Sequence, residues 1–352
     1  MPLQRAALAT VAAVAVSLTA CAPAGLTTVA GDAAPGPGSS PVASHTASSS
    51  MPATARTTTP TSAPPTSTPT TSIPTTSASP PSPAGPTQPT AAPSTPTPDV
   101  PSAEVTDPPA DLTLLRPGTN HNWAADKAGY VYPASTVNAW LTGTKRRPDK
   151  KIVFLTFDDG PNPQTSHVIL DALKKARVHA TFFVVGSQIG SAPDVLSRQI
   201  AEGHSVSPHS WSHDYSLLYP GRRGSTETIT QECDRTVARI REVLGDDYAP
   251  QSWRYPGGHM SWTGLEGADR ALAQRGITWI DWNSDTRDSA PTSDRPKTVK
   301  QTVKNATIQV REGYHVIVVL GHDTHEKKLT SESVGAMIRA FKHAGYSFGT
   351  IS

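Results

Sequence analysis

The feature that most constrains the fold is a regular alternation of strand-like and helix-like segments that begins at Ile152. Residues 152–157 (IVFLTF) are typical of a buried strand, and helical spacing of apolar residues follows at 168–176. Further strands are predicted at 180–185, 204–208, 253–255, 278–282, 315–320 and 347–351, and further helices at 195–202, 227–244, 265–275, 298–310 and 331–344. This alternation predicts an α/β fold with a parallel sheet, either closed as a barrel or doubly wound.

The side chains with the most reactive chemistry share one position, because each ends or follows a predicted strand. They are Asp158 and Asp159 after the first strand, His209 and His213 after the third, Arg254 in the fourth, Asp285 and Asp288 after the fifth, and His322 after the sixth. Parallel α/β folds place their sites at the carboxyl ends of strands. We therefore expect these residues to meet at one face of the domain.

Adjacent carboxylates at a strand end repel each other, so the pair in the segment TFDDGP needs compensation. A metal ion on one carboxylate and a cation near the other would supply it. Asp, Gly, Pro and Asn are also ordinary turn residues, which leaves a helix-capping turn as the alternative. Two histidines four positions apart, His209 and His213, can share a metal ion. With Asp159 they make a two-histidine, one-carboxylate set that suits catalytic zinc and also non-haem iron.

Two further residues are ambiguous when each is taken alone. His322 follows the strand HVIVVL, where a lone histidine is more often structural than catalytic. Arg254 is compatible with a surface cation, although the glycines after it allow a backbone to approach a ligand closely. The combination of these residues is more specific than any one of them.

In this order the residues resemble the five motifs of the polysaccharide deacetylases of carbohydrate esterase family 4, the NodB-homology domain. The resemblance runs from about residue 151 to residue 352. The motifs are TFDDGP at 156–161, His209-x-x-x-His213, RYPGG at 254–258, DTRD at 285–288 and LGH at 320–322. The fourth motif commonly ends in Trp in this family, and Ser289 stands there instead, which bears on substrate preference more than on the chemistry.

The resemblance implies a distorted (β/α) barrel of about seven strands that binds one divalent metal ion. Zinc is favoured, with cobalt or manganese as alternatives. Asp159, His209 and His213 would bind the metal. Gly257 and Tyr255 would contribute to the oxyanion or substrate site, with the backbone N–H of Gly257 facing the oxyanion.

The same resemblance assigns the catalytic groups. Asp158 would be the general base and His322 the general acid. Arg254 would orient Asp158. Asp285 would orient His322, with Asp288 as the second candidate.

The N-terminal third differs sharply in composition from the rest of the chain. It contains 22 of the 34 prolines, and the first aromatic residue of the chain is Trp123. Such a segment cannot bury enough apolar surface to offset its chain entropy. We therefore predict a disordered Pro/Thr/Ser-rich linker at 22–110, a composition that also suits O-glycosylation. The aromatic residues at 111–150 instead predict an N-terminal extension that packs on the catalytic domain of residues 151–352.

Residues 1–21 are predicted to be an export signal, because Arg5 precedes a short apolar run. The run ends in Leu-Thr-Ala-Cys21, which resembles the cleavage box of bacterial lipoproteins. Lipidation of Cys21 would hold the protein at the outer face of the cytoplasmic membrane, within the cell wall. An ordinary signal peptide is the alternative.

Together these features predict a metal-dependent deacetylase of N-acetylated cell-wall glycan, most simply peptidoglycan at N-acetylglucosamine or N-acetylmuramic acid. Chitin-like oligosaccharides and acetylxylan are the alternative substrates, and an inactive glycan-binding lipoprotein is the alternative function. The 29 basic and 25 acidic residues after position 110 are too balanced for a nucleic-acid surface. We expect a monomer.

Overall fold

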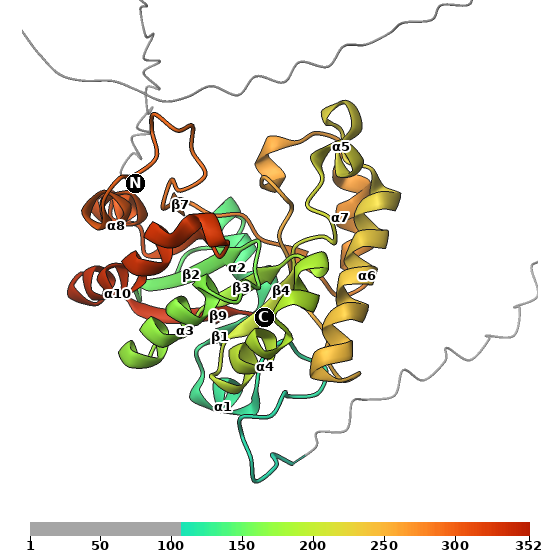
Figure 1. Cartoon of the computed structure of the whole chain (residues 1–352), viewed down its shortest axis with the longest axis horizontal. Coiled ribbons are helices and arrows are strands. Elements are labelled where there is room, and N and C mark those ends of the chain that lie inside the picture. The colour runs from blue at the N-terminus through green and yellow to red at the C-terminus, as the bar shows by residue number, and fades with distance from the viewer. Residues whose placement is uncertain (1–106) are drawn as a thin grey trace, which may run out of the picture. The chain divides into compact units, whose positions relative to one another are not determined.

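The computed structural model of the chain describes residues 107–352, which form an α/β domain built on parallel strands (Figure 1). The predicted export signal, Cys21 and the predicted linker up to residue 106 lie outside the described residues. All strand pairs that the structure describes within named strands are parallel. The prediction of an α/β fold with a parallel sheet is confirmed.

The strands are β1 (Val131–Tyr132), β2 (Ile152–Asp158), β3 (Thr181–Val184), β4 (Ser205–Pro208), β5 (Ser252–Trp253), β6 (Thr278–Trp279), β7 (Ser284–Asp285), β8 (Val316–His322) and β9 (Ser347–Ile351). The α-helices are α1 (Trp123–Ala128), α2 (Ala134–Thr142), α3 (Thr165–Ala176), α4 (Pro193–Ala201), α5 (Tyr215–Leu218), α6 (Thr226–Leu244), α7 (Glu266–Ala273), α8 (Val299–Ala306), α9 (Ile308–Arg311) and α10 (Lys328–His343). Short 3-10 helices are η1 (Gly186–Ser191), η2 (Pro220–Arg222), η3 (His259–Ser261) and η4 (His325–Lys327).

Strand β2 lies at the centre of the sheet. It pairs with β8 along its whole length, with β9 at its first three residues and with β3 at its last three. The sheet continues from β3 to β4 and from β8 to β7, while β5 and β6 form a separate pair. The N–H of Arg254, just after β5, donates to the carbonyl of Pro208 at the end of β4 over 3.5 Å. This bond joins the β5–β6 pair to the edge of the main sheet, in the arrangement of the distorted barrel that was predicted.

Alternation along the strands decides which side chains enter the barrel. In β2, Val153, Leu155 and Phe157 pack in the outer core beneath the helices. Ile152 and Phe154 pack in a second cluster with residues of β3 and β8. The residues that continue this inner face are Thr156 and Asp158. The two-residue period thus places the Asp158 carboxylate on the inner face of the central strand, at its carboxyl end.

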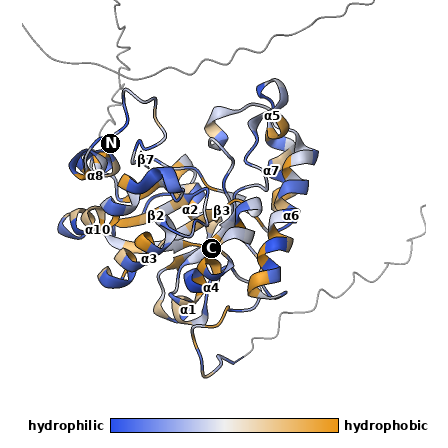
Figure 2. Ribbon diagram, viewed as in Figure 1, coloured by the Kyte–Doolittle hydropathy of each residue, from blue (hydrophilic) through white to orange (hydrophobic). Residues whose placement is uncertain are grey.

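The helices cover the outside of the strands. Helix α10 packs between α3 and α8, and α6 packs against α4 and α7 (Figure 1). Figure 2 shows that α6 carries both apolar and polar residues along its length. Its buried apolar residues, Ile229, Cys233, Val237 and Ile240, recur at helical spacing. Cys233 is thus a buried core residue, and none of the helices within 107–352 has the length and apolarity needed to cross a membrane.

Residues 111–150 contain three elements that the sequence pattern did not reveal. Strand β1 pairs with β9, and Trp140 of α2 packs in the cluster that holds Phe154. The side-chain amide of Asn120 donates to Ser207 Oγ over 2.9 Å, inside the domain. These contacts attach residues 111–150 to the strands of the domain.

Replacing Trp140 by alanine is expected to lower the free energy of unfolding by about 3–5 kcal/mol, because a 93% buried indole leaves a cavity against the barrel. Urea unfolding monitored by circular dichroism measures this loss. Lys145→Ala, at an exposed position beyond the same helix, is the control and is expected to change stability by less than about 0.5 kcal/mol. Equal effects of the two substitutions would contradict the packing role of residues 111–150.

Candidate active site

A buried ion pair lies at the carboxyl end of β2. Arg254 has no exposed surface, and its Nη1 lies 2.7 Å from Asp158 Oδ1 and 2.6 Å from Thr156 Oγ1. Its Nε donates to the carbonyl of Ile280 over 2.9 Å. A buried guanidinium is stable only when its donors are paired in this way. Burial raises the pKa of Asp158, and the charge of Arg254 opposes that rise, so that the pKa lies at about 6.

Asp159 lies one residue further and faces two histidines. Its backbone has φ of 74°, the left-handed region that non-glycine residues rarely adopt. Its Oδ1 lies 3.5 Å from His209 Nε2 and 3.3 Å from His213 Nε2. That oxygen is buried without a hydrogen-bond partner within the part of the chain that the structure describes. A buried carboxylate oxygen left unpaired between two ring nitrogens fits a bound cation.

The protonation of His209 is fixed by a neighbouring backbone group. Its Nδ1 lies 2.8 Å from the carbonyl oxygen of Arg254, which can only accept, so Nδ1 carries the hydrogen. Burial also holds the pKa of His209 well below its usual range. The ring is therefore neutral, and its Nε2 presents a lone pair toward Asp159, as a metal ligand requires.

The potential ligand atoms of Asp159, His209 and His213 all lie within 4.8 Å of one another. One oxygen and two nitrogen ligands with open positions suit a catalytic divalent metal site. The structure thus brings together the three residues that the sequence predicted as metal ligands. His322 lies beside the cluster, with its Nε2 4.0 Å from Asp159 Oδ2.

The prediction that Asp285 orients His322 is wrong, because Asp288 occupies that position. Asp288 Oδ1 lies 2.6 Å from His322 Nδ1, and its Oδ2 accepts from the His322 backbone N–H over 3.0 Å. The carboxylate of Asp285 instead accepts from the N–H of Arg287 over 2.6 Å, within its own turn. This turn after β7 brings Asp288 back over the end of β8. Burial opposes the charged form of His322, but the hydrogen bond and the charge of Asp288 outweigh it and raise its pKa to about 9.

These groups line a cavity of about 310 Å³. Its lining comprises Asp158, Asp159, His209, His213, Tyr215, Gly257, Trp282, Ser289, Leu320, His322 and Lys327. Gly257 is present as predicted. The side chain of Tyr255 is not, because it is fully buried and its hydroxyl donates to Asp269 over 2.8 Å.

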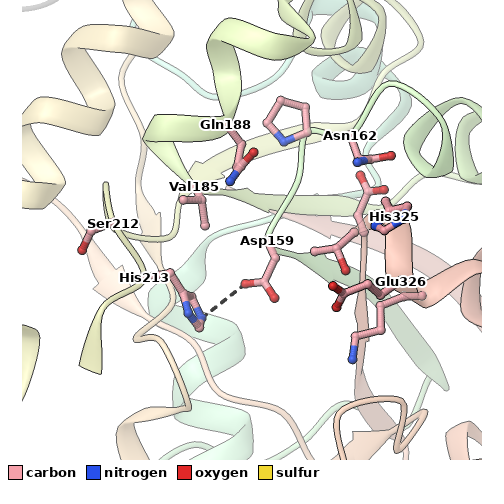
Figure 3. A pocket seen from close by; sticks show the side chains of 12 residues that line it. Asp159, Asn162, Val185, Gln188, Ser212, His213, His325 and Glu326 are labelled. Carbon is pink, nitrogen blue, oxygen red and sulfur yellow. Dashed lines mark ion pairs between the residues drawn. The ribbon is translucent and has the colours of Figure 1, made fainter. Parts of the chain in front are cut away.

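A second cavity, of about 420 Å³, adjoins the first and shares Asp159, His213 and Lys327 with it. Figure 3 shows Asp159 and His213 pointing toward one another, with His325 and Glu326 on the opposite wall of this second cavity. Sequence reasoning missed several lining residues, including Tyr215, Trp282 and Lys327. Among the other lining residues, Leu320 belongs to the LGH motif and Ser289 follows the DTRD motif, so both carried a sequence signal.

Comparison with known proteins agrees with this geometry. The family model "polysaccharide deacetylase" matches residues 145–274. The structure of a Streptococcus mutans CE4 esterase is 43% identical with a TM-score of 0.64, and the alignment covers 68% of this chain and 99% of that one. A Bacillus cereus peptidoglycan-N-acetylglucosamine deacetylase is 31% identical over 205 residues, which cover 57% of this chain and 69% of the relative. This chain belongs to the polysaccharide deacetylase family.

Some relatives are much longer than the segment they share with this chain. The Bacillus subtilis peptidoglycan-N-acetylmuramic acid deacetylase PdaC is 33% identical over 205 residues, which are 58% of this chain and 39% of PdaC. The Listeria monocytogenes peptidoglycan-N-acetylglucosamine deacetylase PgdA is 32% identical over 209 residues, again 39% of its length. The chain thus matches less than half the length of either relative.

Replacing Asp288 by asparagine is expected to move the alkaline limb of the pH–activity profile to lower pH. A raised histidine pKa keeps His322 protonated up to about pH 9. Without the carboxylate, burial dominates and lowers that pKa. The measurement is kcat/KM for acetate release against pH.

Asp285→Asn serves as the matched control for this prediction and is expected to move the limb less, since Asp285 forms no hydrogen bond with His322. A limb that stays in place in Asp288→Asn, or moves further in Asp285→Asn, would contradict the assignment of Asp288.

Proposed function

We propose that this chain is a metal-dependent hydrolase that removes N-acetyl groups from a cell-wall glycan, with peptidoglycan as the substrate class. The observation that carries the proposal is the cavity of about 310 Å³, in which Asp158 and His322 flank the Asp159–His209–His213 cluster. This set provides a base, an acid and a metal site around one cavity. The alternative of an inactive glycan-binding protein is disfavoured because no member of the set is missing.

Asp158 is the proposed general base. A divalent ion held by the cluster would polarise the acetyl carbonyl and acidify the attacking water. Asp158 lies beside that cluster, with its Oδ2 3.7 Å from His209 Nε2. Arg254 holds the other carboxylate oxygen, so Oδ2 remains free to accept the proton. A pKa of about 6 leaves Asp158 ionised at neutral pH yet basic enough to take a proton.

His322 is the proposed general acid. An amine is a poor leaving group unless its nitrogen is protonated, so the acid must carry its proton at neutral pH. A pKa of about 9 meets that requirement. Gly257 lines the same cavity, and we propose that its backbone N–H donates to the carbonyl oxygen as negative charge develops there.

The assignment to peptidoglycan rests on the relatives and on the N-terminal sequence. PdaC and PgdA are named for deacetylation of peptidoglycan N-acetylmuramic acid and N-acetylglucosamine respectively. Lipidation at Cys21, followed by the Pro-rich linker, would place this domain within the wall where such glycans occur. A Bradyrhizobium relative named chitooligosaccharide deacetylase keeps chitin-like substrates as the second candidate.

The deciding experiment is a substrate panel on a sample of measured metal content. Acetate release is compared for peptidoglycan, chito-oligosaccharide and acetylxylan, before chelation, after chelation and after metal is restored. We expect release from peptidoglycan to disappear with the metal and to return with it. Turnover of acetylxylan with none of peptidoglycan would refute the proposed substrate class, and retained turnover after complete metal removal would refute the metal role.

Asp158→Asn is expected to lower kcat for acetate release by about 10²–10⁴-fold, because the amide cannot take the water proton. The metal content should stay at the wild-type level, since Asp158 is not one of the three proposed ligands. Unchanged acetate release would refute the base assignment. Loss of metal together with activity would instead assign Asp158 to the metal site.

A further inference from the structure

The loop that carries both histidine ligands has an unusual backbone. It runs from His209 to His213, and both Ser210 (φ of 65°) and His213 (φ of 56°) adopt the left-handed conformation. Such residues persist only where surrounding contacts hold them. The spacing of His209 and His213 therefore depends on whatever holds this loop.

The hydrogen bonds of the loop divide between two neighbouring elements. Its carbonyls at Ser210 and Trp211 accept from the N–H groups of Gly186 and Ser187 in η1, over 3.0 and 3.1 Å. Its N–H groups at Trp211 and Ser212 both donate to one carboxylate oxygen, Oε2 of Glu232, over 3.1 Å each.

The second oxygen of that carboxylate completes the attachment. Oε1 of Glu232 accepts from Ser212 Oγ over 2.7 Å. Arg235, one turn along α6, lies over the ring of Trp211 at 3.7 Å. On the other side, a methyl group in place of the Gly186 hydrogen would lie 2.6 Å from the Trp211 ring. The residues between the two ligands are thus held between α6 and η1.

From this arrangement we infer that Glu232 is a positioning residue for the metal site, and this inference rests on the metal site of the proposed function. Three hydrogen bonds to one carboxylate hold the loop in a definite geometry. They fix Trp211 and Ser212, and through them the ring of His213, whose Nε2 must stay near Asp159 Oδ1 at 3.3 Å. Glu232 touches neither the cavity nor the ligand atoms, so its effect on the metal passes through the loop backbone.

The test is the zinc affinity of the metal-free full chain, titrated in competition with a chromophoric chelator. Glu232→Ala is expected to raise Kd by about 10–100-fold, the range for loss of a residue that orients a ligand. Glu232→Gln keeps one acceptor and the shape of the side chain, so it should raise Kd by less. Activity lost in Glu232→Ala should return at saturating zinc.

The matched controls are Glu227→Ala and Glu227→Gln, on the same helix, whose carboxylate accepts from Gln231 and not from the loop. Their zinc affinity should equal that of the wild type. The thermal midpoint of each metal-free variant reports its folding, and Glu232→Gln carries the test where Glu232→Ala is unfolded.

Unchanged zinc affinity in a folded Glu232 variant, or an equal loss in the Glu227 variants, would overturn the inference. A wild-type chain that binds zinc without releasing acetate from any glycan would overturn the proposed function while leaving the Glu232 result valid. A wild-type chain that binds no divalent ion would overturn both.

Discussion

The buried pair of Arg254 and Asp158 is the interaction on which the rest of the site depends. Placing a guanidinium in the barrel costs several kcal/mol of hydration, and only a full set of partners offsets that cost. Those partners come from β2 and from the segment after β6. Arg254 also offers its own carbonyl to His209. One residue therefore holds the proposed base and fixes the protonation of a proposed metal ligand, so the two proposed functions share a single geometry.

Carboxylates outside the reaction hold the loops around this pair. Glu232 accepts hydrogen bonds from the loop 209–213, and Asp288 contacts His322. Asp281 accepts from the N–H groups of His259 and Met260. Asp323 is fully buried and accepts from two hydroxyls at the start of α3, and burial raises its pKa to about 7. Carboxylates suit this task because each accepts several N–H or O–H groups at once. The irregular loops at the strand ends thus acquire fixed positions without regular secondary structure.

Features of the fold and site that depend on neighbouring residues in the sequence could be predicted, and features that depend on contacts between distant residues could not. Long runs such as 152–157 and 315–320 carry a pattern that needs only neighbouring residues, and both are strands. Strand β7 has two residues and is defined by its pairing with β8, so no local pattern marks it. The predicted helix 298–310 divides into α8 and α9 at Thr307, whose hydroxyl binds the Val303 carbonyl. Glu232 belongs to no motif, because its contact with the loop arises only when α6 packs beside η1.

The choice between Asp285 and Asp288 shows the same limit more sharply. Asp285 ends β7 and Asp288 lies three residues later, so both carboxylates lie near the end of the neighbouring strand β8. The pairing of β7 with β8 decides between them, since it places Asp285 beside Leu320, two residues before His322, and leaves Asp288 to reach His322. On the other side, β8 pairs with β2 so that Asp158 lies directly opposite His322. A slip of one residue would turn either side chain to the outer core. With this register, the ionised form of Asp158 and the protonated form of His322 coexist between about pH 6 and pH 9, because burial and Asp288 move their pKa values to those limits. Burial and the Asp288 carboxylate thereby set the pH range in which the proposed base and acid can act together.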